Sequence, residues 1–585
     1  MSESPALRTT VQPEAEQPEA DPGLPMTKRW DPAALEREAA ELQALQNQPF
    51  FRRAMGYLKR TGPGLLQSAM TLGAGSATAS VVAGASFGYK LLWVQPLAMF
   101  LGICMLAALG NVVLTTGERP YRAVGRELSR VLAFLWALGT ILASVIWHFP
   151  QYGLAAAAAR DLGNMAGVAS QAEFLEIAEG QEVVYHTRID PASAELFRAQ
   201  LAYPEAYILT NRTEQQWAEA APKAQRQFTL FTSTGVHLSW FIGLLILSIN
   251  VLVVWSYGSS PRGIKLYEWF LRSVIGLMIL LFAVVVLGNV TKIQWGELVK
   301  GFIGWYGIPQ AENPKHVTLV LGMLGAAVGI NMTFLYPYSL LAKGWGPAHK
   351  TLARWDLAMS MFVPFTLVTS LIMLGMTVTG VYTGQDVLRE TIQPVAAAQS
   401  FTDVLGGYWG RLIFNLGLIA MPCSAISAHM VVCGFTMCEM LGLPYTKARF
   451  RLFALTPSIG ILGVVTKLPF WFPVLASGIC FALLPIAYVI FFLLNNKRSY
   501  IGDAVGRGWR RLVWNVVLLL AIALATSGAV IQIKTRVIDE LRKRLAPAPA
   551  ASLPAGPSLF GRIEGDAGRA RPGAIQGRFL QGHRT

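Results

Sequence analysis

The sequence predicts an all-α integral membrane protein with about eleven transmembrane helices. Of its 585 residues, 53% are hydrophobic and only 14% are charged, and the mean hydropathy is +0.43. This composition is typical of a polytopic membrane protein and not of a soluble enzyme. The net charge of +15 fits the same class, because membrane proteins concentrate Lys and Arg in cytoplasmic loops. No nucleic-acid-binding motif accompanies the basic residues.

The chain divides into two polar ends and an apolar middle. Residues 1–55 are interpreted as a mostly disordered cytoplasmic tail, because Pro, Glu and Ser dominate their first part. A short helix is expected to begin after Asp31, with Pro32 at its first position. Residues 56–535 form the predicted transmembrane domain. Residues 536–585, rich in Pro, Ala, Gly and Arg, are expected to be a disordered C-terminal tail.

Eleven apolar stretches make up the middle of the chain. They cover roughly residues 62–88, 91–116, 131–162, 236–257, 270–290, 316–342, 356–380, 405–438, 451–466, 469–495 and 509–533. The short loops on one side of these spans carry 18 Lys and Arg residues, and those on the other side carry 6. This bias places the N-terminus in the cytoplasm of a cell whose plasma or inner membrane the protein would span.

A polar insert at 166–235 separates the third span from the fourth. It is rich in glutamate and is expected to form an extracytoplasmic subdomain of short helices. Arg160 and Asp161, just before it, are expected to be interfacial. Two ionisable residues lie well inside spans, His148 and His429. Such groups are candidates for function, because they are expensive in hydrocarbon.

The first span, Gly62–Trp93, is weak at its centre. It has no charged residue before Lys90, yet Gly73 and Gly75 interrupt it, and glycine costs about 1 kcal/mol relative to alanine in a helix. This pattern predicts a discontinuous helix of the kind that lines a substrate site in secondary transporters. Glycines used only for close helix packing are an equally weighted alternative at this point.

The sixth span has a similar interruption. Gly325, Gly329 and Pro337 break its helical pattern, and Asn331 and Thr333 are polar at its centre. Four spans separate it from the first span, as expected for the first members of two five-helix repeats. The alternative is a proline kink without a ligand.

Several segments resemble the NRAMP (natural resistance-associated macrophage protein) family of divalent metal ion transporters. They are Gly62–Leu66, Ala83–Tyr89 and Leu91–Trp93 in the first span, Gly325–Val328 in the sixth and Phe481–Pro485 in the tenth. The resemblance covers about residues 55–500 and leaves out the insert. It implies a LeuT-like arrangement of inverted five-helix repeats, with helices 1 and 6 broken.

The family's metal-binding motifs are missing, so the chain looks like a divergent member. The DPGN motif falls on Gly73–Ser76, which puts glycine in place of the aspartate that ligates the metal and serine in place of the asparagine. The MPH motif falls on Gly329–Asn331, without its methionine or its histidine. The acidic pair associated with proton movement falls on His148 and Gln151.

The candidate site therefore consists of neutral groups. The candidate substrate- or ion-binding residues are Thr71, Gly73, Gly75, Ser76, Gly329, Asn331 and Thr333, and the candidate coupling residues are His148 and Gln151. Backbone and hydroxyl oxygens would hold a dehydrated transition metal poorly, and without a thioether nothing selects a soft metal. A hydrated magnesium ion remains open, as does an organic cation beside Phe334 and Tyr336. A structural role for His148 is as well supported as a coupling role.

We therefore expect a secondary transporter that moves a small solute by alternating access. The default substrate is a divalent metal cation of the magnesium or manganese type. The alternatives are a carrier of a non-metal solute and a non-transporting membrane sensor or scaffold on the same fold. No nucleotide-binding loop or hydrolase triad occurs, so neither enzymatic activity nor a cofactor is expected. The expected partners are the lipid bilayer and the solute, without nucleic acid; the oligomeric state stays open.

Overall fold

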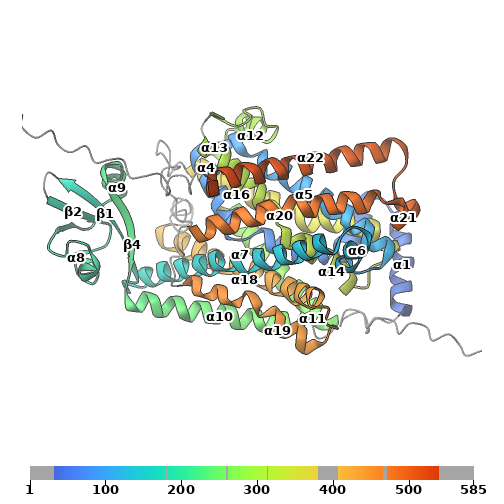
Figure 1. The fold of residues 1–585 in the computed structure, drawn as a ribbon. Helices are drawn as coiled ribbons and strands as arrows, with labels where there is room; N and C mark the ends of the chain where they lie inside the picture. The colour runs from blue at the N-terminus through green and yellow to red at the C-terminus, as the bar shows by residue number, and fades with distance from the viewer. Residues whose placement is uncertain are drawn as a thin grey trace, which may run out of the picture. The chain divides into compact units, whose positions relative to one another are not determined.

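The fold comes from a computed structural model that describes residues 32–179, 182–257, 261–312, 314–379, 406–464 and 471–538. Most of these residues are helical (Figure 1). The expected helix after Asp31 is present as α1 (Pro32–Gln46). The two expected disordered tails lie largely outside the described residues.

Long helices form the apolar body of the protein (Figure 1). They are α3 (Pro63–Thr71), α4 (Ala74–Phe87), α5 (Val94–Thr116), α7 (Arg130–Met165), α10 (Ser233–Tyr257), α11 (Pro261–Gly288), α13 (Pro314–Ala327), α14 (Ile330–Ala342), α15 (Lys350–Asp356), α16 (Val363–Thr379), α18 (Gly407–Met440), α20 (Trp471–Asn496) and α22 (Gly508–Gln532). Shorter helices connect them: α2 (Phe50–Leu58), α6 (Pro120–Glu127), α12 (Trp295–Phe302), α19 (Lys447–Ala454) and α21 (Arg498–Ile501).

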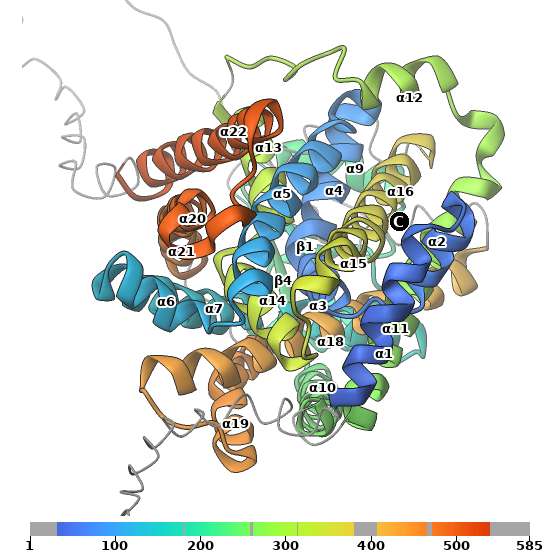
Figure 2. The ribbon, with the colours of Figure 1, turned by 90° about the vertical axis from the view of Figure 1, so that its right-hand side faces the viewer.

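Ten of the eleven expected spans have an α-helical counterpart in this set. By length and composition, 7 helical segments of the described chain are apolar enough to cross a membrane. The first span is divided into α3 and α4, and the sixth into α13 and α14. The predicted membrane fold is thus confirmed. In Figure 2, α3 lies in the middle of the bundle, where it packs against α11, α14, α15 and α18.

The ninth expected span, 451–466, is not one α-helix. The short α19 is followed by a 3₁₀ helix, η9 (Thr456–Val464). Gly460 of η9 lies against His148, and Gly463 lies against the backbone of Phe149. A Cβ atom at either glycine would collide with α7. The tighter 3₁₀ winding and the missing side chains together allow this close approach.

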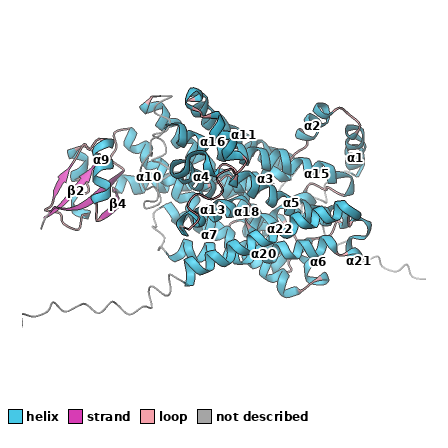
Figure 3. Ribbon diagram, turned by 90° about the horizontal axis from the view of Figure 1, so that it is seen from above, coloured by secondary structure: helices cyan, strands magenta, loops and turns pink. Residues whose placement is uncertain are grey.

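The polar insert forms a sheet, so the expectation of a subdomain of short helices is wrong (Figure 3). Its strands are β1 (Gln171–Glu179), β2 (Glu182–Thr187), β3 (Tyr207–Leu209) and β4 (Arg226–Phe231), in the order β3-β2-β1-β4. β1 pairs antiparallel with β2 and β4, and β2 pairs parallel with β3. Two short helices, α8 (Pro191–Glu195) and α9 (Glu214–Ala220), lie in the connections.

Aromatic and branched residues explain why the insert is a sheet. Phe174 of β1 and Tyr185 of β2 are fully buried in one small core with Phe197. On the other face of β1, Leu175 packs in a second core with Trp217 of α9. Such residues favour strands, because they pack well on a pleated surface. The glutamates between them had suggested helices.

Arg160 and Asp161, which were expected to be interfacial, are buried by the protein and connect helices. The Asp161 carboxylate accepts hydrogen bonds from the guanidinium of Arg411 and, at 2.6 Å, from Nδ2 of Asn415, which tie α7 to α18. Arg160 donates to Oγ of Ser239 at 2.6 Å, and its guanidinium lies 4.2 Å from the ring centroid of Phe231. Asp161 thus connects α7 to α18, and its neighbour Arg160 connects α7 to α10.

We expect Asp161→Ala to lower the free energy of unfolding by about 1.5–3 kcal/mol, because hydrogen bonds to a charged group contribute about that much. The measurement is thermal unfolding of the detergent-purified protein. Glu195→Ala is the control, because the exposed pair of Glu195 with Arg198 contributes at most about 1 kcal/mol. Equal losses in the two variants would contradict the role of Asp161.

Candidate functional site

The first helix is interrupted at Leu72 and Gly73. Leu72 has ψ of 66°, and Gly73 is extended, with φ of −126° and ψ of −168°. The predicted discontinuous helix is confirmed. Ser76 stabilises the interruption, because its hydroxyl donates to the carbonyl of Thr71 at 2.6 Å and to that of Gly73 at 3.1 Å. Because the Ser76 hydroxyl acts as a donor in both bonds, the lone pairs of its oxygen remain available to a ligand.

The sixth helix is interrupted in the same way at Val328 and Gly329, which is extended with φ of −96° and ψ of 163°. The Asn331 side-chain oxygen accepts from the amide of Met332 at 3.0 Å. Thr333 donates to the carbonyl of Ile330 at 2.5 Å and accepts from the indole nitrogen of Trp136 at 2.9 Å. Thr333 is thus occupied by protein partners, whereas Asn331 lies at the break.

The two broken helices pack together, α3 against α14 and α4 against α13. Gln67 of α3 joins them: its amide donates to the carbonyl of Met332 at 3.2 Å and accepts from the backbone amide of Tyr336 at 3.1 Å. The sequence interpretation missed Gln67, although a glutamine within Gly62–Met70 was a visible signal.

A buried carboxylate holds the start of α3. Asp356, at the end of α15, accepts hydrogen bonds from the amides of Gly62 at 3.0 Å and Gly64 at 2.6 Å. Next to it, Lys343 pairs with Glu268 at 2.8 Å. These partners were also missed, because they lie at span ends in the sequence. Asp356 places negative charge at a helix N-terminus, where the helix dipole favours it.

Gly73 and Gln151 lie against each other, so the structure brings together two residues predicted from different motifs. A Cβ atom at Gly73 would lie 2.7 Å from Nε2 of Gln151 and 3.3 Å from Cβ of Ala425. The Gln151 amide therefore fills the space of a side chain at position 73. At Gly75 a Cβ atom would meet nothing nearer than Trp147, at 3.7 Å.

A thioether is present at the sixth-helix break, which corrects the expectation that none is available there. Met332 is buried, and its sulfur lies 3.3 Å from the backbone nitrogen of Gly329. In the sequence, this methionine lies three residues after Gly329, outside the aligned motif. One helical turn separates the two positions and brings the sulfur back to the break.

His148 does not lie at either break. It is fully buried, Nδ1 bonds with the carbonyl of Ser144 at 2.9 Å, and its ring centroid is 5.2 Å from that of His429. Within the described residues, no group of three or more His, Cys, Asp or Glu side chains is placed to hold a metal ion. An ion at the breaks would be coordinated mainly by neutral oxygens.

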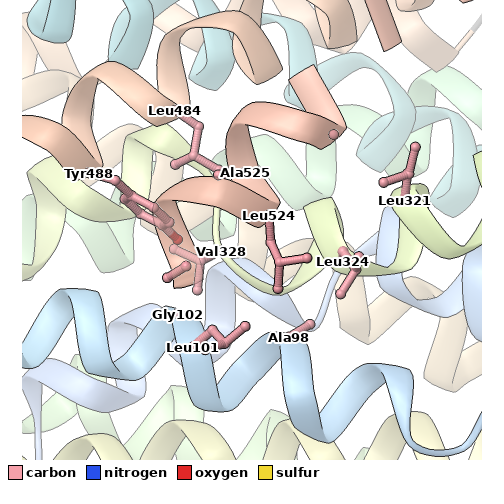
Figure 4. A pocket seen from close by; sticks show the side chains of 12 residues that line it. Ala98, Leu101, Gly102, Leu321, Leu324, Val328, Leu484, Tyr488, Leu524 and Ala525 are labelled. Carbon is pink, nitrogen blue, oxygen red and sulfur yellow. The ribbon is translucent and has the colours of Figure 1, made fainter. Parts of the chain in front are cut away.

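A small pocket of about 60 Å³ lies beside the sixth-helix break, where α5, α13, α20 and α22 converge (Figure 4). Its lining is aliphatic apart from Tyr488. Val328 reaches toward it from the break and packs against Gly102 of α5. This pocket offers an ion almost no ligands, so it is separate from the candidate site.

The fold and the two breaks define the class of this protein: an integral membrane protein built as a secondary transporter of the LeuT type. The chain belongs to the family described as natural resistance-associated macrophage protein-like, whose pattern it matches over residues 64–183 and 230–530.

Known proteins with similar sequences or structures agree with this family. A curated relative, the divalent metal cation transporter MntH of Vibrio campbellii, is 21% identical over 500 residues, which cover 83% of this chain and 95% of the relative. A solved mutant of the manganese transporter of Eremococcus coleocola has a TM-score of 0.55 at 14% identity, covering 86% of this chain and 90% of that one. MhsT in complex with L-phenylalanine has a TM-score of 0.50 at 14% identity, covering 80% and 98%. These two structures show the fold alone.

We expect Gly73→Ala to destabilise the protein in the presence of Gln151 and to be tolerated in a Gln151→Ala background. The added methyl group competes with the amide for the same space, and residues in contact show interaction energies of about 0.5–3 kcal/mol. Thermal unfolding of the two single variants and the double variant measures this energy. Gly75→Ala is the matched control and should unfold no earlier than the wild type. If Gly73→Ala loses the same stability in both backgrounds, the two positions do not share the space.

Proposed function

We propose that this protein is a secondary transporter that moves a divalent metal cation across the membrane by alternating access. One observation carries the proposal: two interrupted helices, packed against each other, expose backbone groups in the middle of an apolar bundle. Irregular backbone is tolerated at membrane depth only where protein buries it or where it lines a cavity. The family, and the transport of metal cations named for MntH and for the manganese transporter, support the choice of substrate.

The proposed ligands are the residues at the breaks. They are Thr71, Gly73, Gly75, Ser76, Gly329, Asn331 and Thr333, with Met332 added. Thr333 contributes least, because Trp136 and Ile330 already engage its hydroxyl. The set contains no carboxylate, so the ion would keep part of its water shell. The Met332 sulfur is a softer ligand than oxygen, so it adds nothing for magnesium, which prefers oxygen.

The proposed orientation follows the positive charges. With the N-terminus in the cytoplasm, α3 and α14 form the inner half of the path, α4 and α13 form the outer half, and the insert with β1–β4 is extracytoplasmic. Every residue of α3 is buried. The Asp356 contacts to Gly62 and Gly64 then act as the inner gate, which must open for an ion to leave.

The same proposal places residues 56–535 in the transporter domain of a plasma or inner membrane protein. Its activity is translocation, without a covalent step, a nucleotide or a cofactor. Coupling residues are proposed at His148 and Gln151; only Gln151 touches a break, through Gly73.

We expect proteoliposomes containing the wild-type protein to take up Mn²⁺, and Asn331→Ala to lower the uptake rate at least tenfold, because this change removes a side-chain oxygen from the break. Radioactive or fluorescent uptake measures the rate for a panel of divalent ions that includes Mg²⁺. Asn289→Ala is the control, since Asn289 is also buried and its side-chain amide donates to the carbonyl of Val285 in α11, away from the breaks.

If the wild-type protein takes up no divalent ion faster than protein-free liposomes do, the metal proposal is wrong. Unchanged uptake in Asn331→Ala would instead show that the ion binds elsewhere.

A further inference from the structure

Two buried histidines in contact have ring nitrogens without partners. His148 of α7 and His429 of α18 are 0% and 2% exposed, and their ring centroids are 5.2 Å apart. Nε2 of His148 and Nδ1 of His429 have no hydrogen-bond partner, and neither does the hydroxyl of nearby Tyr152. A buried polar atom left unpaired costs about 1–3 kcal/mol. The ring of Tyr152 lies beside that of His148, with centroids 6.1 Å apart, so unpaired polar atoms on three adjoining rings indicate a site for a polar ligand.

The hydrogen bond of His148 defines its tautomer. A carbonyl oxygen can only accept, so Nδ1 of His148 carries the proton that it donates to the carbonyl of Ser144 at 2.9 Å. Nε2 therefore has a free lone pair. Histidines that ligate metals usually hold their other ring N–H on a carbonyl or carboxylate in this manner. His148 is thus prepared as a neutral ligand.

The distance between the rings fits one metal ion. With metal–nitrogen bonds of about 2.0–2.1 Å and a tetrahedral angle, the centroids of two imidazoles lie about 5 Å apart. The observed separation is 5.2 Å. A water molecule bridging the same nitrogens through hydrogen bonds of about 2.8 Å would hold the centroids about 6 Å apart. A metal ion held between the two rings agrees with the observed centroid distance, which also lies in the usual range for packed rings.

The pair lies next to the first-helix break. Gly73 faces Gln151 and Ala425; His148 precedes Gln151 by three positions along α7, and His429 follows Ala425 by four positions along α18. The two helices are antiparallel: Asp161, late in α7, pairs with Arg411, early in α18, whereas His148, earlier in α7, lies beside His429, later in α18. The histidines are thus displaced from the break in the same direction, by about one helical turn of 5.4 Å.

This displacement points toward the end of the bundle that contains α3 and α14. Trp136, farther along α7 in the same direction, bonds with Thr333 of α14. In the proposed orientation this is the cytoplasmic side. Gly460 of η9 packs on the backbone side of His148, against its Cβ. An ion that leaves the break inward would meet the histidines next.

We propose that His148 and His429 form a second, inner binding site for a divalent transition metal that prefers imidazole nitrogen: Zn²⁺, Co²⁺, Ni²⁺ or Cu²⁺. The inference rests on the proposed function for the route by which the ion arrives. Neutral imidazoles are established Zn²⁺ ligands in catalytic sites, where three protein ligands and a water complete the coordination. Two protein ligands leave the other coordination positions to water, which suits an ion that must move on. Mg²⁺, which prefers oxygen, binds poorly here.

Co²⁺ titration of the tag-free, detergent-purified protein tests the site. We expect one equivalent of Co²⁺ to bind with a visible absorption band of nitrogen-coordinated cobalt, and Zn²⁺, but not a hundredfold excess of Mg²⁺, to displace it. His148→Gln and His429→Gln should each weaken binding at least tenfold. His237→Gln is the control, because His237 is exposed on α10. Unchanged Co²⁺ affinity in both site variants would overturn the proposal.

A second measurement needs no variant. Cu²⁺ bound at one equivalent to the wild-type protein should give electron paramagnetic resonance couplings from two imidazole nitrogens, and a spectrum with oxygen ligands only would refute the pair.

Uptake assays separate this inference from the proposed function. If the protein takes up a divalent ion but binds no Co²⁺ through nitrogen, only the histidine site is wrong. Binding without uptake of any divalent ion would remove the transport proposal and leave the site.

Discussion

The structure depends on one constraint: a peptide group inside a bilayer has no water with which to pair. Two helices are nevertheless interrupted in the middle of the bundle, and polar side chains from the same region take over the freed backbone groups. Ser76 bonds with backbone groups at the break of the first helix, and Asn331 and Thr333 do so at the break of the sixth helix. The Gln67 amide bonds with two backbone groups of α14 and so joins the broken helices. The polar residues of these spans therefore maintain the irregular backbone as well as being available to a solute.

At the centre of the bundle, a side chain of α7 fills space that the first helix leaves empty. Position 73 has no side chain, and the amide of Gln151 fills the space in its place. A neutral amide from α7 thus lies where the family resemblance puts a carboxylate on the first helix. This removes a formal negative charge from the break. A cation there must rely on dipoles of carbonyls, hydroxyls and Asn331, which attract it less strongly than a carboxylate does.

Local patterns in the sequence predicted much of the fold, but not the contacts between distant residues. Apolar length and the interruptions at Gly73 and Gly329 were sufficient to predict the spans and both breaks. The insert was misinterpreted, because the glutamates of β1 obscured the strand-forming residues between them. The sulfur of Met332 was missed, because the alignment places it away from the motif and only the helical turn returns it to the break. The contact of His148 with His429, like that of Asp161 with Arg411, joins α7 to α18 and leaves no sign in either segment alone.

The connection of the sheet to the helices has a further consequence. The strands that enter and leave the insert, β1 and β4, are neighbours in the sheet. At their base the amide of Thr232 donates to the carbonyl of Ser170 at 3.1 Å. The chain thus leaves the bundle and returns to it at nearly the same point, so the length of the insert does not affect the spacing of α7 and α10. Such a single stem makes the insert a natural grafting position, where a folded tag can serve as an alignment marker for electron microscopy without altering the helices.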